Sequence, residues 1–218
     1  MNTRNAEYGS VGRCGRRYVL GLTALLLTFR GGTAGATAVD GSAQAFIQRL
    51  GNQTLAILDE PVTPEQRLQG LKQLLDQSTD LELIARLVLG RYWREANASQ
   101  REEYVRLFKE LVMQTMAERF SWYTGETFEI TSAKPVDDRD TMVATRILRP
   151  SGKPPILVEW RVRQSDSGYL LIDILAEGVS LVVTQRSEAA EVISQRGVDG
   201  LLADLRARLA KRNGLAAT

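Results

Sequence analysis

The stretch Leu89–Trp122, LGRYWREANASQREEYVRLFKELVMQTMAERFSW, determines the plan of the chain. Gly90 is the residue type that commonly ends a helix. Asn97 is a favoured N-cap residue, and Gln100 follows it at the spacing of a capping box. The pattern therefore predicts a corner between two helices, with the aromatic residues Tyr92 and Trp93 inside it.

The helix after this corner is expected to run to about Trp122. Ser99 with Glu102 offers an alternative start, two residues later than Asn97. Leu111–Ala117 contains no charged residue, so the apolar face broadens toward the C-terminal half. The apolar positions include Tyr104, Leu107, Phe108, Leu111, Val112, Met116 and Phe120. A face this broad must be covered on more than one side.

Three further helices are expected before the corner. From Ser42 to about Leu58, apolar residues recur at helical spacing. The segment 63–66, Thr-Pro-Glu-Gln, combines a cap, a proline in the first turn and the glutamine of a capping box. Asp80 is expected to cap a short helix that ends near Gly90.

After Gly125 the hydrophobic period changes from helical to strand-like. Short polar or Gly/Pro-rich connections separate the strands, which indicates an antiparallel meander. A helix from about Leu181, a break at Gly197–Gly200 and a final helix follow. We therefore predict an α+β fold, a four-stranded antiparallel sheet with five to six surrounding helices. The predicted strands are Thr127–Ser132, Thr141–Leu148, Ile156–Arg163 and Tyr169–Leu175.

Residues 1–38 have the features of a secretory signal peptide. Arg13, Arg16 and Arg17 precede a twelve-residue apolar run, Tyr18–Phe29, and an A-x-A cleavage site ends at Ala38. Twelve residues are too few to span a membrane, although a retained amphipathic helix is an alternative. We expect export, cleavage near Ala38 and one mature domain, 39–218. The pair Arg16-Arg17 resembles a twin-arginine signal, so both the Sec and the twin-arginine routes stay open.

Charge gives no reason to expect a nucleic-acid partner. Of the 28 basic and 26 acidic residues, five basic and one acidic lie in residues 1–38. The remaining 23 and 25 give a net charge of −2. A nearly neutral chain lacks the positive surface that phosphate backbones require.

Residue types that the chain lacks exclude much chemistry. It has no histidine, and its one cysteine, Cys14, lies within the predicted signal. Ser-His-Asp and Cys-His nucleophiles, the usual zinc sites and disulfides are therefore excluded from the mature chain. We therefore expect that the protein is not an enzyme and that it has no catalytic residues, metal or cofactor. Catalysis by carboxylate, lysine or tyrosine side chains alone remains an open alternative.

Two carboxylate groups need separate interpretation. Asp173 and Glu177 lie four residues apart at a strand end, where a structural role is favoured over a catalytic pair. Asp137, Asp138 and Asp140 lack the later glycine and glutamate of an EF-hand and are interpreted as a solvated turn.

Periodicity alone leaves two interpretations of the broad apolar helix. It can pack solidly against the sheet, as apolar stripes usually do, or it can cover a cavity for an apolar ligand. A solid interaction module, and a small isomerase or dehydratase that uses Asp173 or Glu177 with a tyrosine, are the alternatives to a ligand carrier.

Two motifs carry a family resemblance. The segment 87–115, LVLGRYWREANASQREEYVRLFKELVMQT, and the segment 170–206, LLIDILAEGVSLVVTQRSEAAEVISQRGVDGLLADLR, resemble the signatures of the periplasmic phospholipid-binding proteins of the maintenance-of-lipid-asymmetry (Mla) system, the toluene-tolerance family. The resemblance extends from about Ala43 to Lys211. Ala98-Ser99 replaces the family's usual Pro-Glu pair, and Met116 stands where an aromatic residue is common.

The resemblance implies a monomeric periplasmic carrier that holds phospholipid acyl chains between sheet and helices. Its implied partners are an outer-membrane lipoprotein/porin complex and the lipid-binding subunit of an inner-membrane ABC transporter. The candidate lipid-binding residues combine this implication with the apolar pattern. They are Leu107, Phe108, Leu111, Met116, Phe120, Met142, Ala144, Trp160, Val162, Ile172, Ile174, Val179 and Val182. A one-residue error in strand parity would exchange the sheet members for their neighbours.

Overall fold

The computed structural model describes residues 37–216 apart from 151 and 167, and the side chains of 43–212 with the same gaps. The predicted signal peptide lies almost entirely outside this range, so its cleavage near Ala38 stays a prediction. Within the described range, we find no helix that is both long and apolar enough to cross a bilayer.

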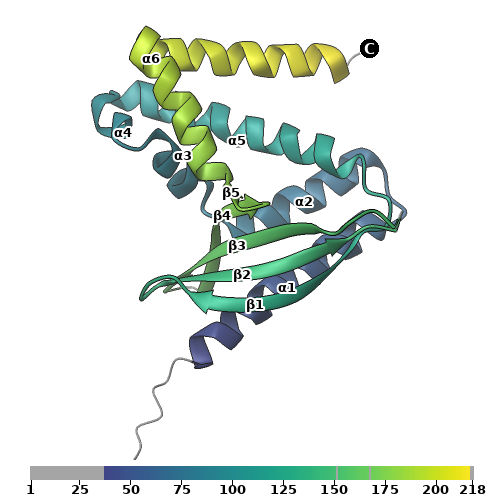
Figure 1. Cartoon of the computed structure of the whole chain (residues 1–218). Coiled ribbons are helices and arrows are strands. Elements are labelled where there is room, and N and C mark those ends of the chain that lie inside the picture. The colour runs from purple at the N-terminus through teal and green to yellow at the C-terminus, as the bar shows by residue number, and fades with distance from the viewer. Residues whose placement is uncertain (1–36, 151, 167, 217–218) are drawn as a thin grey trace, which may run out of the picture. The chain divides into compact units, whose positions relative to one another are not determined.

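The described residues form six helices and five strands (Figure 1). The helices are α1 (Thr37–Asp59), α2 (Pro64–Ser78), α3 (Leu81–Leu89), α4 (Tyr92–Glu95), α5 (Ala98–Phe120) and α6 (Leu181–Ala216). The strands are β1 (Thr127–Pro135), β2 (Asp140–Leu148), β3 (Ile156–Ser165), β4 (Gly168–Ala176) and β5 (Val179–Ser180).

The strands form one antiparallel sheet in the order β1-β2-β3-β4-β5. The predicted α+β class and the meander of four long strands are confirmed. The count of four strands was wrong by one, because β5 pairs with Leu175 and Ala176 at the end of β4. The two-residue turn between them is tight: Glu177 and Gly178 have φ of 49° and 78°, in the left-handed region.

The predicted helix starts are confirmed by their hydrogen bonds. The Thr63 hydroxyl accepts the backbone N–H of Gln66, whose side chain accepts the N–H of Thr63 in return. Asn97 and Gln100 form the same capping box, which selects the earlier of the two possible starts for α5. Asp80 caps α3 through the N–H of Leu83 at 2.9 Å.

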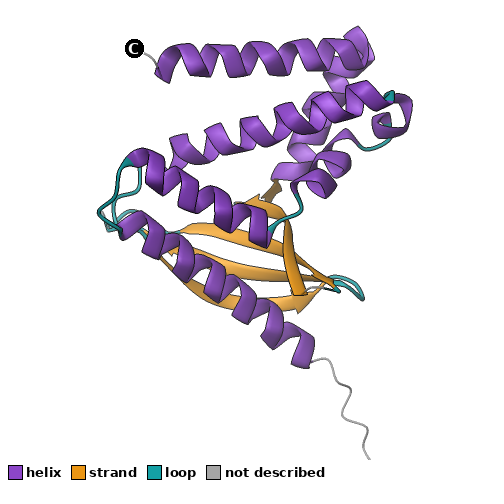
Figure 2. Cartoon of the chain, turned by 180° about the vertical axis from the view of Figure 1, so that it is seen from behind, coloured by secondary structure: helices purple, strands orange, loops and turns teal. Residues whose placement is uncertain are grey.

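Helix α1 covers one face of the sheet (Figure 2). Ala43 and Ile47 of α1 are buried against it. Gly51 approaches β1 so closely that a Cβ atom there would lie 2.1 Å from the ring of Phe128, so a larger residue would force this ring to move. We call the buried members of this contact the sheet core; they are Ala43, Ile47, Val143 and Val162.

The start of β2 corrects the interpretation of Asp140 as part of a solvated turn, whereas Asp137 and Asp138 are exposed as predicted. Asp140 is 1% exposed, and its carboxylate accepts hydrogen bonds from Arg163 Nε at 2.6 Å and Arg161 Nε at 2.8 Å. Burial raises the pKa of Asp140, but the hydrogen bonds from both arginines outweigh it and leave that pKa below its usual value. Asp140 therefore links β2 to β3 through its ion pairs with Arg161 and Arg163.

Helix α6 bends at Gly197, where φ is 70°. The predicted break at Gly197–Gly200 is thus confined to one residue. The first half of α6 reaches α3, where Arg186 Nε donates to the carbonyl of Leu87. The second half lies along α5, where Arg206 and Glu103 form a bidentate ion pair.

Candidate functional site

Two separate hydrophobic cores stabilise the described chain. One is the sheet core. The other, which we call the helical core, is formed by α3, α4, the first half of α5 and α6. Its buried members include Leu89, Tyr92, Tyr104, Leu107, Phe108 and Leu202. No buried residue from the second half of α5 belongs to either core. That half of the helix can therefore form part of a separate apolar site.

The two halves of α5 differ in burial. Tyr104, Leu107 and Phe108 are fully buried, whereas no residue of the range 111–120 is. Six of those ten residues are nevertheless apolar: Leu111, Val112, Met113, Met116, Ala117 and Phe120. Apolar surface left in partial contact with water favours any ligand that would cover it, by about 25 cal/mol per Å².

Helical geometry assigns opposite roles to the two sides of this half-helix. Arg212 of α6 donates to Thr115 Oγ1 at 2.8 Å and pairs with Glu118 at 3.3 Å. Figures 1 and 2 both show α5 between the second half of α6 and the sheet. At 100° per residue, the side turned away from α6 carries Met113, Met116, Ala117 and Phe120.

A half-open groove of about 210 Å³, which we call the α2–α5 cavity, lies on this side, between α2 and α5. It is smaller than the roughly 300–1,000 Å³ of typical ligand pockets. Two acyl chains would therefore fit only after α2 and α5 move apart. The lining residues are Pro64, Glu65, Arg67, Leu68 and Leu71 of α2, and Ala117, Phe120 and Ser121 at the end of α5.

The predicted α5 residues do not share one environment. Phe120 lines the cavity, and Met116 lies half-buried on the same side of α5. Leu107 and Phe108 belong to the helical core instead. Leu111 packs against that core from the side of α6. The broad apolar face is thus shared between a solid core and a cavity.

Strand register divides the predicted sheet residues into two groups. Met142 and Ala144 pair with Arg161 and Glu159 and point away from α1. The others lie on the α1 side of the sheet or at the irregularity of β4: Trp160, Val162, Ile174 and Ile172. The expectation that all six line one wall was therefore wrong for Met142 and Ala144.

The cause of this error is that the α1 side of β2 is partly polar. Thr141 and Thr145 are buried there on either side of Val143. Thr145 Oγ1 accepts the indole N–H of Trp160 at 2.8 Å and donates to the carbonyl of Val158 at 3.0 Å. Because these hydrogen bonds satisfy its hydroxyl, Thr145 can be buried. Residue type alone would instead assign the threonines to the exposed face of β2, and Met142 and Ala144 to the buried face.

The two predicted lipid-binding residues that follow β4, Val179 and Val182, also lie in different environments. Val179 is 58% exposed, whereas Val182 is buried in the helical core. Helix α2 carries a leucine stripe at helical spacing, formed by Leu68, Leu71, Leu74 and Leu75. Leu68 and Leu71 of that stripe line the cavity, and no signal beyond their helical spacing marks them.

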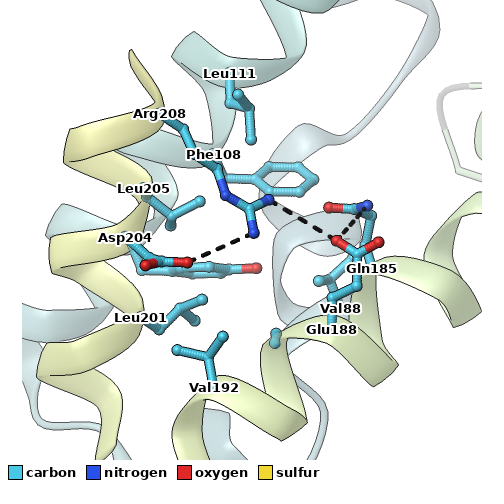
Figure 3. Close-up of a pocket in the computed structure, with 12 residues that line it drawn as sticks. Val88, Phe108, Leu111, Gln185, Glu188, Val192, Leu201, Asp204, Leu205 and Arg208 are labelled. Carbon is cyan, nitrogen blue, oxygen red and sulfur yellow. Dashed lines mark hydrogen bonds and ion pairs between the residues drawn. The ribbon is translucent and has the colours of Figure 1, made fainter. Parts of the chain in front are cut away.

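A second cavity, of about 30 Å³, lies inside the helical core (Figure 3). Arg208 closes it by pairing with Asp204 at 3.5 Å and Glu188 at 3.8 Å. Tyr104 also lines it; its buried hydroxyl has no hydrogen-bond partner among the described residues, and burial raises its pKa. This volume suits one water molecule, which would satisfy the hydroxyl, and is too small for an acyl chain.

The carboxylates of Asp173 and Glu177 accept hydrogen bonds that have a structural role. The Asp173 carboxylate accepts the Ser180 hydroxyl at 2.5 Å and the backbone N–H of Val182 at 3.1 Å, at the start of α6. Glu177 accepts the backbone N–H of Leu157 at 2.9 Å. Within the described range, no three His, Cys, Asp or Glu side chains form a group that could hold a metal ion.

The corner between α3 and α5 is closed by Trp93. The guanidinium groups of Arg86 and Arg101 lie 5.3 and 5.5 Å from the centre of its ring. Arg101 Nε also donates to the Trp93 carbonyl at 2.7 Å, while Tyr92 is buried next to it. These contacts favour a role for both aromatics in fixing the direction of α5.

We therefore expect Trp93→Ala to lower the free energy of unfolding by about 2 kcal/mol. This is below the roughly 3–5 kcal/mol of a fully buried tryptophan, because Trp93 is only partly buried. Urea unfolding at neutral pH measures the change, and Trp122→Ala, at a 67% exposed position, is the matched control. An unchanged midpoint together with lost ligand would instead place Trp93 at the ligand.

Comparisons with known proteins give matches over most of the chain. A family model described as the MlaC protein matches residues 48–207. The intermembrane phospholipid transport system binding protein MlaC of Haemophilus influenzae is 27% identical over 126 residues, which are 56% of this chain. The match spans 59% of that relative's length.

A solved structure is also similar. The phospholipid-binding protein from Ralstonia solanacearum, in complex with a phospholipid, is 29% identical with a TM-score of 0.69. The likeness covers 79% of this chain and 99% of that one.

Proposed function

The chain belongs to the MlaC family, and from this premise we propose that it is a periplasmic phospholipid carrier. It binds acyl chains against α2 and the second half of α5. It shuttles lipid between an outer-membrane complex and an inner-membrane ABC transporter. The observation that carries the proposal is the half-buried apolar side of α5 over a cavity, in a chain whose two cores lie elsewhere.

Two relatives support this proposal. The H. influenzae protein is named for phospholipid transport between membranes, and the R. solanacearum protein was solved with a phospholipid bound. The second likeness covers 79% of this chain and 99% of that one, which supports a phospholipid-binding fold for this chain.

The energetics suit a carrier that needs partners. Each CH₂ group moved out of water contributes ~0.8 kcal/mol, so two C16 tails contribute on the order of 20 kcal/mol before opposing costs. Spontaneous release would then be slow. A membrane complex that offers the tails another apolar site makes handover possible, and α2 and α5 must separate for the tails to enter or leave.

Native mass spectrometry of the mature chain, residues 39–218, tests this proposal. Protein purified from a Gram-negative host without detergent should carry a mass increment equal to one or more phospholipids. Lipid extraction followed by fragmentation should identify the tails. A folded protein, verified by circular dichroism, that carries no lipid would sink the proposal and favour a solid interaction module.

A further inference from the structure

Arg67 stands out among the residues that line the α2–α5 cavity. It is the fourth residue of α2, and its Nε is buried without a hydrogen-bond partner among the described residues. Its Nη2 donates to the carbonyl of Glu60 at 3.1 Å, which holds the side chain at the end of α1. The guanidinium is therefore anchored at one end and has an unused donor at the other.

An unused donor of this kind is costly. A buried N–H without an acceptor loses the hydrogen bonds it made to water. Within the described residues, no carboxylate lies within 4.0 Å of the Arg67 guanidinium. The acceptor that completes the site is then either a water molecule or an oxygen of a bound ligand.

The other lining residues restrict the chemical class of the ligand that can supply this acceptor. Leu68, Leu71 and Phe120 give the cavity apolar walls. Ser121 directs its hydroxyl to the carbonyl of Glu118, at 2.7 Å. Glu65, the one acidic residue of the lining, is solvent-exposed, so water and salt screen its charge. The ligand therefore combines hydrocarbon with an anionic oxygen group that matches a guanidinium.

We propose that Arg67 binds the phosphate of the carried lipid and so places the head group at the α2 end of the cavity. This inference rests on the proposed function and adds a specificity-determining contact to it. The same chemistry would also accept the carboxylate of a free fatty acid, so the test must separate the two sources.

Competition among three lipid probes tests the inference. The probes are a phosphatidylethanolamine, the diacylglycerol with identical tails, which lacks the phosphate, and oleic acid. A hydrogen bond to a charged group contributes about 1.5–3 kcal/mol, so wild-type protein should retain the phospholipid at least tenfold over the diacylglycerol. Arg67→Met should bring that ratio close to one while still binding both.

Two further variants keep the result decisive. Arg67→Lys retains the cation and should keep part of the preference even if the methionine variant folds poorly. Arg119→Met removes an exposed arginine next to Phe120 and should leave the ratio unchanged.

Equal loss of both lipids in Arg67→Met, with the ratio preserved, would mean that Arg67 is only structural. Retention of oleic acid over phospholipid by the wild type would overturn the assignment to phosphate. Wild-type protein that binds none of the probes would contradict the proposed function itself.

Discussion

Replacing Ala117 with tryptophan is expected to weaken lipid binding in the α2–α5 cavity while the protein stays folded. Ala117 lines that cavity on the side of α5 turned away from α6. An indole ring there would occupy space that the acyl chains need. Excluding only three CH₂ groups from contact costs about 2.4 kcal/mol, which lowers affinity more than tenfold. After competition with excess phospholipid vesicles, native mass spectrometry should therefore show a lower lipid-bound fraction for the variant than for wild type.

The stability of this variant should change little. Overpacking a tight core costs about 1–3 kcal/mol, but Ala117 is only half-buried and borders open volume. Ala203→Trp is a matched control, because Ala203 is exposed on α6, which lies on the other side of α5. It should keep its lipid. Normal lipid content in Ala117→Trp, with the melting temperature unchanged, would show that the chains bind elsewhere.

Much of the fold could be predicted because its signals are local. The capping boxes of Thr63 and Asn97 each need only four consecutive residues, and both are present as predicted. The hairpins of the meander depend on short turns between alternating strands. The bend in α6 follows from Gly197, whose left-handed φ few other residues tolerate.

The candidate site was harder to predict because it depends on contacts between distant segments. Leu68 and Phe120 line one cavity although 52 positions separate their numbers in the chain. The side of β2 that faces α1 carries Thr145, whose hydroxyl is satisfied only by partners on β3. Hydrophobic pattern cannot reveal a polar residue that is buried with its partners, and so it gave the wrong parity for Met142 and Ala144.

The buried Asp140 illustrates the same difficulty with charge. Three aspartates in one short segment are typical of an exposed turn, and Asp137 does accept the backbone N–H groups of Arg139 and Asp140. The signal for burial lay on another strand, where Arg161 and Arg163 occupy alternate positions. Only the pairing of β2 with β3 brings these charges together.

Asp140→Asn should cost about 3 kcal/mol of unfolding free energy at neutral pH. Removing one partner of a buried ion pair typically costs about 3–5 kcal/mol, and the low end applies because Arg161 and Arg163 keep 34% and 23% of their side-chain surface exposed. Urea unfolding measures the loss. Asp138→Asn, which removes an exposed carboxylate from the same turn, should change stability by less than about 0.5 kcal/mol.

The difference between wild type and Asp140→Asn should depend on pH in one direction. The pKa of Asp140 lies below its usual value in the folded protein, so the folded state favours the ionised carboxylate. Its contribution is complete above the unfolded pKa of about 4 and is lost as pH falls through the lower folded value. Other carboxylates titrate in both proteins and cancel in the difference. Unfolding curves at pH 7, 5 and 3 should thus give equal differences at the first two values and a smaller one at the third. A difference that is the same at all three would mean that the arginines stabilise Asp140 no better than water does.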